Sequence, residues 1–364
     1  MYRVPVISKE GKPLMPTKAS RARRWLKEGK AIIHKNDLHC FSIQLTVESG
    51  EETQPIAVGI DPGKHYSGIG VQSSKATLFT AHLELPFPRI KDRMETRAMM
   101  RRGRRGRRIN RKLPFDQRTH RQKRFDNRRG HKLPPSIKAN RQLEYRVVKE
   151  LARLFPIFSI IYEIAKAKGD KGFSPVMVSQ KVMTEQWLPQ IASVTTKFGW
   201  ETSARRNTLG LEKDRQKSNQ TPATHAVDGV ALASCQFLQY KSLKGDQGWF
   251  EGNVKITNAP FFVIKRPPVS RRQLHLMLPT KGGTRRKYGG TVTRHNFRKG
   301  DYVEAEKAGI KYRGWVSGDT KIQVSVSNFN WKRIAQFSKN RVELLQRSTG
   351  LICKQETAFV GATR

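Results

Sequence analysis

Cysteines, acidic residues and long apolar runs are all scarce in this sequence. Among its 364 residues are three cysteines, which lie far apart and form no Cys-x-x-Cys pair. This spacing excludes a disulfide framework and argues against a zinc finger or zinc ribbon, so we expect a reduced, cytoplasmic setting. The N-terminus lacks the apolar core of a signal peptide, and no run is long enough to span a membrane. The sequence therefore predicts neither a membrane protein nor a secreted one.

The shortage of acidic residues leaves the chain strongly basic. It contains 71 Lys and Arg against 29 Asp and Glu, which gives a formal net charge of +42 at pH 7. Charge of this size repels itself within a compact protein and indicates a polyanionic partner, for which nucleic acid is the first candidate. Apolar residues still make up 37% of the chain. The sequence therefore predicts a folded nucleic-acid-binding protein of two or three domains rather than a basic tail.

The first fifty residues predict a small α+β domain. Strands are expected over 4–8, 31–35 and 40–47, and a helix capped by Ser20 is expected to end at Lys27. The segment 10–13 contains Gly and Pro and is expected to form a turn.

An antiparallel meander is predicted over 55–85. A run of apolar and small residues over 56–60 indicates a buried strand that ends at Asp61, and strands over 68–72 and 76–85 follow it. This places an acidic residue at the end of a buried strand.

The α/β pattern resumes after a long basic insert. Apolar residues at helical spacing predict a helix over 137–155, and a strand follows over 157–164 with Glu163 near its end. After an interval expected to be rich in loops, a helix capped by Thr221 begins and places Asp228 in its opening turn.

The basic insert, residues 89–132, is the most biased segment of the chain. Such a segment cannot fold against itself, so it is either disordered or a helix whose arginines meet phosphates on several sides. We favour the helix, because the run interrupts an α/β domain instead of lying at a terminus. Its expected nucleic-acid-binding residues are Arg97, Arg101, Arg102, Arg104, Arg105, Arg107, Arg108, Arg111, Lys112, Arg118, Arg121 and Arg124.

The C-terminal region is basic and rich in short alternating strands. Strands are expected over 300–305, 312–316 and 321–326, as in a small β-barrel. Loops suited to phosphate contact are expected at Arg271 and Arg272, Lys281–Gly283 and Arg285–Lys287.

Asp61, Glu163 and Asp228 share a setting at the end of a strand or the start of a helix. A desolvated carboxylate there needs a cation, and Mg²⁺ is the cation expected beside phosphates, with two ions able to clamp a phosphodiester during hydrolysis. His225 precedes Asp228 by three residues, so a helix would place both on one face, where His225 could activate water or bind the phosphate. Singly, each acid is more often a cap or turn residue. Only the set of three favours a catalytic site.

The motifs around these residues resemble a known family. Gly59-Ile60-Asp61-Pro62-Gly63, Tyr162-Glu163-Ile164 and His225-Ala226-Val227-Asp228 resemble the three split motifs of RuvC-type nucleases, which have an RNase H-like fold. Lys12–Pro16 is similar to the PLMP motif of transposon-encoded IscB proteins, and the arginine-rich insert resembles the bridge helix of RNA-guided effectors. The short interval between the second and third motifs lacks a His-Asn-His pattern. In this respect the chain resembles IsrB, the group of relatives without an HNH nuclease.

This resemblance implies a domain order. An RNase H-like RuvC core would be split by an Arg-rich bridge helix and flanked by a small N-terminal α+β domain and a C-terminal β-rich domain. The implied regions are the PLMP domain over 1–50, RuvC part I over 51–90, the bridge helix over 91–132, RuvC part II over 133–200, RuvC part III over 201–245, and a guide-RNA and target-adjacent-motif region over 246–364.

The resemblance also implies an activity and partners. Asp61, Glu163 and Asp228 would bind Mg²⁺, as two ions for which Mn²⁺ can substitute, with His225 assisting. A structured guide RNA, called ωRNA, would pair with a double-stranded DNA target beside an adjacent motif, and the enzyme would nick the displaced non-target strand. One protein per RNA is expected, in a prokaryotic cytoplasm and at the nucleoid when the protein is bound to DNA.

Two other interpretations of the residues stay open. A guide-independent, structure-selective endonuclease such as a junction resolvase would use the same three acids, although the arginine run inside the core weighs against it. A non-catalytic RNA-binding protein of ribosomal type would also be basic, but nothing in that class requires the motifs of Asp61 and Asp228 together. The RNA that copurifies with the protein would distinguish the three.

Overall fold

The computed structural model describes two compact units. The structure covers residues 2–108, 110–117, 133–166, 174–242, 248–269, 274–277, 285–288 and 290–356. Residues 2–34 and 41–263 belong to the first unit, and residues 35–40 and 264–355 to the second. Within the described residues, no helix has both the length and the apolar character needed to cross a bilayer.

The N-terminal region is a small α+β module, as predicted, but its sheet has four strands where three were expected. Its order is β2-β1-β4-β3, built from β1 (Arg3–Ile7), β2 (Pro13–Lys18), β3 (Ala31–His34) and β4 (Ser42–Leu45), with α1 (Ala19–Lys27) against it. Two further expectations were wrong. Pro13 opens β2 rather than ending a turn, and α1 starts one residue before Ser20, with Lys18 as an N-cap residue that makes no side-chain bond.

A larger mixed sheet lies at the centre of the first unit. The predicted meander is confirmed: β5 (Ile56–Asp61), β6 (Tyr66–Ser73) and β7 (Ala76–Glu84) are antiparallel neighbours. The strand β8 (Ile157–Ile164) runs parallel to β5, and β9 (Ser193–Phe198) runs parallel to β8. The sheet therefore contains the order β12-β7-β6-β5-β8-β9, in which β12 is Phe261–Lys265. The mixed α/β class expected from the sequence is confirmed.

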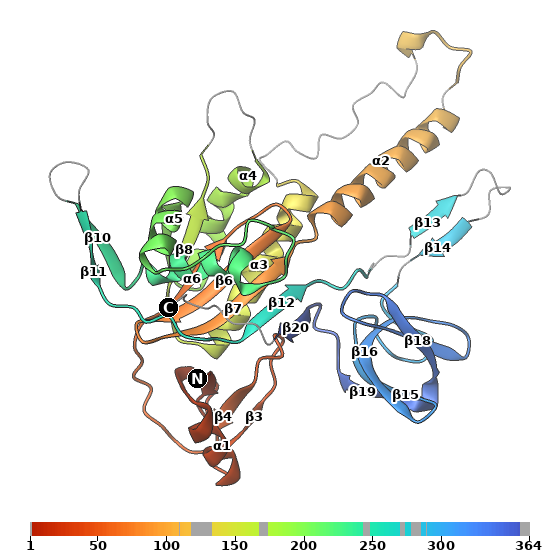
Figure 1. Ribbon diagram of the computed structural model, residues 1–364. Coiled ribbons are helices and arrows are strands. Elements are labelled where there is room, and N and C mark those ends of the chain that lie inside the picture. The colour runs from red at the N-terminus through yellow and green to blue at the C-terminus, as the bar shows by residue number, and fades with distance from the viewer. Residues whose placement is uncertain are drawn as a thin grey trace. The chain divides into compact units, whose positions relative to one another are not determined.

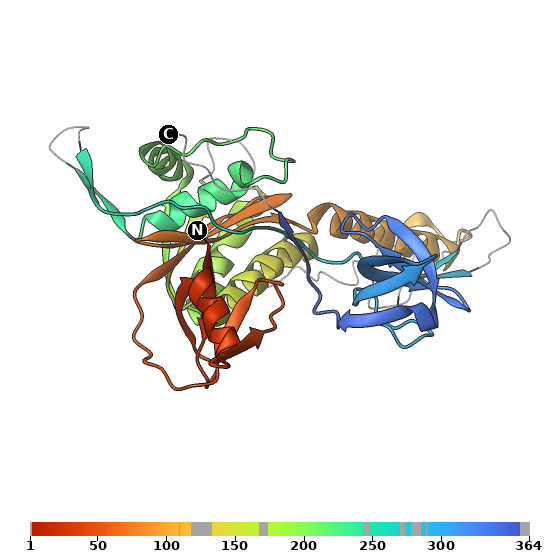
Figure 2. The ribbon, with the colours of Figure 1, turned by 60° about the horizontal axis from the view of Figure 1, so that its bottom comes forward.

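Helices cover both faces of this sheet (Figure 2). On one face lies α3 (Pro135–Leu154), whose apolar stripe includes the buried Leu143, Val147 and Leu151. On the other face lies α6 (Val227–Ser234), which packs mainly on β5 and β6. The core thus has a helix–sheet–helix arrangement around the carboxyl ends of β5 and β8.

The basic insert begins with a long helix, α2 (Phe87–Arg108), which runs outward after β7 (Figure 1). No residue over 87–103 is buried, although one side of the helix contacts α3, so the exposed positions of this stretch are open to a partner. The helix starts inside the region assigned above to RuvC part I and ends well before residue 132. A short 3₁₀ turn, Phe115–Gln117, follows it, and residues 118–132 lie outside the described part of the chain.

The expectation of a loop-rich interval before Thr221 was wrong. The chain there forms α4 (Pro175–Val182), the turns η3 (Met183–Trp187) and η4 (Leu188–Gln190), β9 and α5 (Gly199–Thr208). These elements are short and expose much of their surface, so they have little hydrophobic periodicity. A wide turn, η5 (Pro222–Ala226), then leads into α6, and the Thr221 side chain makes no cap bond.

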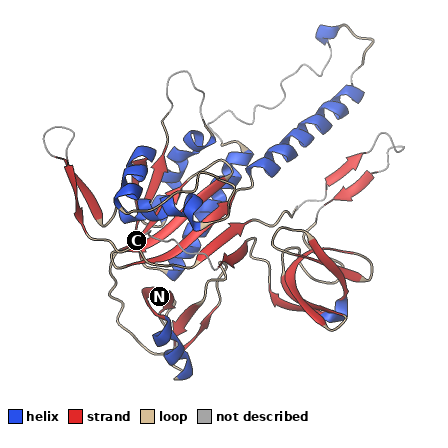
Figure 3. Ribbon diagram, in the orientation of Figure 1, coloured by secondary structure: helices blue, strands red, loops and turns tan. Residues whose placement is uncertain are grey.

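The rest of the chain is rich in strands (Figure 3), as expected. In the second unit, an antiparallel sheet of order β18-β17-β16-β15-β19 contains the three predicted strands and two more. Arg285–Lys287 lies in a strand rather than a loop, while Arg271, Arg272 and Lys281–Gly283 fall outside the described residues. The strands are β10 (Leu238–Ser242), β11 (Gly248–Gly252), β13 (Leu274–Met277), β14 (Arg285–Tyr288), β15 (Tyr302–Lys307), β16 (Ile310–Asp319), β17 (Gln323–Ser327), β18 (Arg333–Ser338), β19 (Val342–Gln346) and β20 (Ile352–Glu356).

Candidate active site

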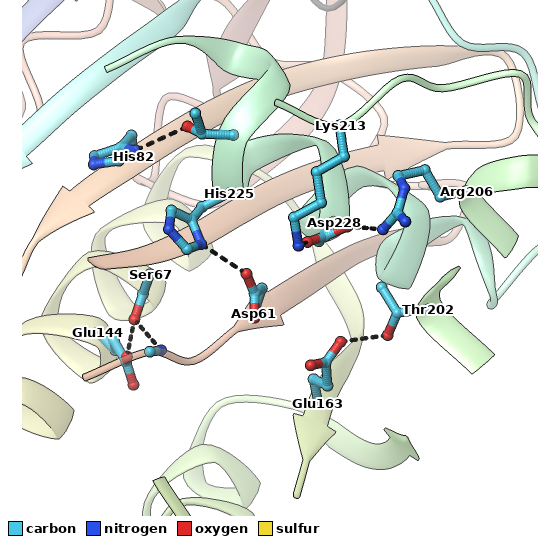
Figure 4. A network of polar contacts seen from close by, with 12 residues as sticks. Asp61, Ser67, His82, Glu144, Glu163, Thr202, Arg206, Lys213, His225 and Asp228 are labelled. Carbon is cyan, nitrogen blue, oxygen red and sulfur yellow. Dashed lines mark hydrogen bonds and ion pairs between the residues drawn. The ribbon is translucent and has the colours of Figure 1, made fainter. Parts of the chain in front are cut away.

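The fold brings the three predicted acids to one end of the central sheet (Figure 4). Asp61 is the last residue of β5, Glu163 is the second-last residue of β8, and Asp228 lies in the first turn of α6. Because β5 and β8 are parallel neighbours, their carboxyl ends meet at the same sheet edge. Asp61 also shares a sheet face with Gly59, which abuts α6, because side chains alternate along a strand.

Glycines allow α6 to approach the sheet closely enough to complete this cluster. A Cβ added at Gly70 would overlap the backbone nitrogen of Val230, and one at Gly68 would overlap the carbonyl oxygen of His225. A Cβ at Gly229, on the helix side, would lie 2.5 Å from the Gly70 nitrogen. The backbones of sheet and helix therefore meet directly.

His225 is bonded to Asp61 rather than to Asp228. Its Nδ1 lies 3.0 Å from Asp61 Oδ2, and the side chain is only 8% exposed. A carboxylate partner makes Nδ1 the donor, which leaves Nε2 of the neutral ring as an acceptor. That Nε2 is buried and has no hydrogen-bond partner among the described residues.

The rings of Tyr66 and His82 flank His225, with centroids 5.9 and 5.5 Å away. His82 Nδ1 lies 3.2 Å from Thr224 Oγ1. Burial lowers the pKa of His82 to about 4, and electrostatic repulsion between the His82 and His225 rings acts in the same direction. His82 is therefore a neutral wall of the site.

Asp228 is held by two cations. Arg206 Nη1 lies 2.5 Å from its Oδ1, and Lys213 Nζ contacts its Oδ2. The Asp228 side chain is 2% exposed. Burial raises the pKa of Asp228, the charge of Asp61 raises it further, and the two cations oppose this shift.

Within the described residues, Glu163 hydrogen-bonds a neutral side chain and forms no ion pair. Thr202 Oγ1, from α5, donates a hydrogen bond of 2.5 Å to its Oε2. Burial raises the pKa of Glu163 to about 7, with the charge of Asp61 as the next contribution and a smaller one from Asp228. The three carboxylates are therefore close enough to repel one another.

A separate polar network holds the turn after Asp61 on the α3 face. Arg141 donates to Gly63 O (2.6 Å) and to Tyr162 OH (2.9 Å), and it pairs with Glu144 at 2.8 Å. Ser67 Oγ donates to Glu144 Oε1 at 2.5 Å. Arg141 and Glu144 are fully buried, so this network fixes the turn after Asp61 against α3.

The carboxylate oxygens of Asp61, Glu163 and Asp228 are of the chemical type that a hard divalent cation prefers as ligands. Three partly or fully buried carboxylates repel one another, and Mg²⁺ or Mn²⁺ would relieve that repulsion through oxygen ligands. Across the described parts of the chain, no three His, Cys, Asp or Glu side chains already converge as a ligand cluster. Asp228 instead faces Arg206 and Lys213, so an ion bound here would compete with these two side chains.

The predicted nucleic-acid-binding residues fall into three groups. Arg97, Arg101 and Arg102 are exposed on α2, and Arg111 and Lys112 are exposed in the turn after it. Arg104, Arg105, Arg107 and Arg108 lie in the last two turns of α2. Arg118, Arg121 and Arg124 lie outside the described residues.

Three polar residues that bond Glu163 or Asp228 directly were not foreseen: Thr202, Arg206 and Lys213. The first two lie on α5, whose start had a usable signal in Glu201, because the Phe198 N–H donates to its Oε2 at 2.7 Å. Lys213 lies in an irregular loop, and no local pattern marks it.

Comparisons with known proteins give two findings. The model of a family described as RRXRR protein matches residues 4–176, which is 173 of 364 residues. This range includes Asp61 and Glu163, and residues 101–105 read Arg-Arg-Gly-Arg-Arg, the pattern of the family's description. RuvC of T. thermophilus, solved in complex with a Holliday junction substrate, is similar at 13% identity over 50% of this chain and 90% of that one, with a TM-score of 0.28. No curated protein matches the chain.

Proposed function

We propose that this protein is a metal-dependent DNA endonuclease of the RuvC type. The observation that carries the proposal is the cluster of Asp61, Glu163 and Asp228 at one sheet end. Asp61 raises the pKa of both other acids, and Glu163 forms no ion pair among the described residues, with Lys213 opposing its pKa shift only as the smallest contribution. Buried carboxylates that repel one another destabilise a fold, and such clusters are typical of catalytic sites.

Each side chain has a defined task in this proposal. Asp61, Glu163 and Asp228 would hold Mg²⁺ or Mn²⁺, which supplies Lewis acidity toward a phosphate and a more acidic water. His225 keeps Nδ1 bonded to Asp61, so its Nε2 is free to accept a proton from the attacking water. Thr202 fixes Glu163, and the Arg141 network fixes the turn that follows Asp61.

We further propose that the endonuclease is guided by RNA and resembles IsrB. A net charge of +42 and the exposed arginines of α2 support binding to a long polyanion such as a guide RNA and its heteroduplex. Asp61, Glu163 and Asp228 supply one candidate nuclease site, which supports cutting of one strand, the displaced non-target strand. One protein would bind one ωRNA and read a short motif beside the target.

The test begins with sequencing of the RNA that copurifies with the protein. A supercoiled plasmid library that carries the complement of that RNA is then incubated with the complex and Mg²⁺. Nicking of one strand, only in matched targets beside a fixed motif, is the expected result. Cutting of branched DNA without RNA would instead establish the junction resolvase, and an Asp61→Asn variant that still cuts would overturn the site.

A further inference from the structure

A basic pocket lies next to the two cations that pair with Asp228. Its volume is about 570 Å³, and it is lined by the end of α5 and the loop over 211–217. Arg206 and Lys213 belong both to this lining and to the ion pairs of Asp228 (Figure 4). The pocket therefore shares two side chains with the candidate active site.

The side chains that line the pocket carry a net positive charge. It contains four basic side chains, Arg206, Lys213, Arg215 and Lys217, against one acid, Glu212. Arg215 and Lys217 are exposed and make no ion pair with any described residue. Two cations of this pocket thus remain available to an anion even while Asp228 holds the other two.

The pocket is built on an ordered loop. Asp214 accepts hydrogen bonds from Gln216 N (2.8 Å) and Asn219 Nδ2 (2.7 Å). The Asp214 N–H donates to Ala223 O at 2.8 Å, which ties the loop to the turn before α6. These bonds order the backbone that carries Arg215 and Lys217, which lowers the entropy that ligand binding would cost.

We propose that this pocket binds the phosphates of the DNA strand that is cut, next to the scissile phosphate. The inference rests on the proposed function and names a substrate subsite for it. Guanidinium and ammonium groups are the usual protein partners of phosphate. The volume falls within the range of about 300–1,000 Å³ of ligand pockets, which suits a nucleotide rather than a single ion.

Arg206 and Lys213 line the pocket and also pair with Asp228. This shared pair of side chains favours the DNA strand over the guide RNA as the ligand of the pocket. Arg206 and Lys213 contact Asp228, so both lie within reach of a strand whose phosphate is bound at Asp61, Glu163 and Asp228. When that strand and a metal ion are bound, these two side chains can exchange the carboxylate for the strand's phosphates. The pocket thus places their positive charge beside the reacting group.

Lysine acetylation footprinting of the wild-type protein tests the assignment without any substitution. A single-stranded 20-nucleotide DNA is added in EDTA, so that no cleavage occurs, and acetylation of Lys213 and Lys217 is compared with that of Lys75. Lys75 is an exposed lysine in the turn between β6 and β7, at the opposite end of these strands from Asp61. Lys213 stays paired with Asp228 while no metal ion is present, so its reactivity should change little. DNA should protect Lys217 and leave Lys75 reactive.

A matched pair of double variants gives a second readout. Arg215→Gln with Lys217→Gln should reduce the slope of log K against log salt by about 1.4, twice the value of about 0.7 for one single-strand phosphate contact. Lys75→Gln with Lys149→Gln removes the same charge from exposed sites outside the pocket and should leave the slope unchanged.

Equal slopes in both double variants, or protection of Lys217 by the copurified RNA and not by DNA, would overturn the pocket. Plasmid nicking by the wild-type protein is scored separately. Nicking without pocket protection rejects the pocket alone, whereas DNA protection without nicking supports the pocket and rejects the nuclease.

Discussion

Both faces of the central sheet bury carboxylates, but the partners of these carboxylates differ between the two faces. On the α3 face, Glu144 is fully buried and has its own cation, Arg141, and its own donor, Ser67. On the α6 face, Asp61 and Glu163 have neutral or histidine partners, and the cations gather on Asp228.

The difference separates structural from functional charge. A buried acid with a built-in counter-ion contributes to the shape of the fold, and breaking such a pair destabilises it. A group of acids that repel one another instead leaves room for a cation supplied from outside. The substitutions below are chosen so that changes on the α6 face affect activity and changes on the α3 face affect stability.

Asp61→Asn should have the largest effect on activity. Loss of a metal-binding carboxylate that also holds His225 should reduce DNA cleavage by about 10⁴-fold or more. Thermal stability should not fall, because the substitution relieves repulsion of Glu163 and Asp228. A plasmid nicking assay and a melting curve of the same sample check both parts. Unchanged nicking, or a markedly lower melting temperature, would break the comparison.

Glu144→Gln should have the opposite signature. It leaves Arg141 buried without its counter-ion, which should lower the free energy of unfolding by about 3–5 kcal/mol. Urea denaturation measures this loss. Glu185→Gln is the matched control, since Glu185 forms only an exposed pair with Lys181 and its loss should change stability by less than about 0.5 kcal/mol. Equal effects of the two variants would contradict a structural role for the α3 network.

Gly70→Ala tests the close contact between sheet and helix. The new methyl group would overlap α6 at Val230, so we expect a loss of about 1–3 kcal/mol in stability and a displaced Asp228. Gly103→Ala, in α2, meets no atom within 4 Å and should stabilise its helix by about 0.5–1 kcal/mol. Thermal melting compares the two variants. A stabilising effect of Gly70→Ala would show that α6 does not need a glycine at this position to pack on the sheet.

The pH dependence of metal binding should follow the protonation of Glu163. Its pKa is raised from 4.5 to about 7, so a proton on Glu163 stabilises the metal-free protein below pH 4.5, and this contribution is lost as pH rises through 7. Mg²⁺ competes with that proton. The Mg²⁺ concentration for half-maximal nicking should therefore rise by about tenfold for each pH unit below 7. Glu163→Gln should remove the pH dependence of Mg²⁺-induced thermal stabilisation, and its persistence would assign the titration to another group.

Thr202→Val should have the smallest effect. It removes the hydrogen bond that favours the charged form of Glu163, so the pH midpoint should move upward by less than about one unit. Thr208→Val is the control, because Thr208 on the same helix is exposed and bonds only the Ala204 carbonyl. A downward shift for Thr202→Val would mean that the bond favours the protonated acid.

The parts of the fold with strong local signals could be predicted from sequence. Apolar runs marked β5 and β8, and the acids at their ends followed from those runs. The interval before Thr221 has short elements with mixed polarity, so β9, α5 and the loop that carries Lys213 were missed. Arg141 and Glu144 were also unmarked, because a basic and an acidic residue three apart on a helix normally form a solvated surface pair.

The geometry of the candidate site depends on contacts that no local pattern encodes. The bond between His225 and Asp61 joins residues 164 positions apart. Predicting His225 and Asp228 on one helical face did not anticipate it, because the wide turn η5 precedes α6 and presents His225 to β5. The role of the glycines at the contact between the sheet and α6 becomes visible only in the packed structure.

Binding of Mn²⁺, measured by electron paramagnetic resonance in the absence of nucleic acid at about pH 8, tests the central claim most directly. The pH is chosen above the pKa of about 7 for Glu163, so that all three acids can bind an ion. The wild-type protein should bind Mn²⁺, Asp61→Asn should lose this binding, and Glu144→Gln should keep it. Equal Mn²⁺ binding by the wild-type protein and Asp61→Asn would contradict a metal site at these carboxylates.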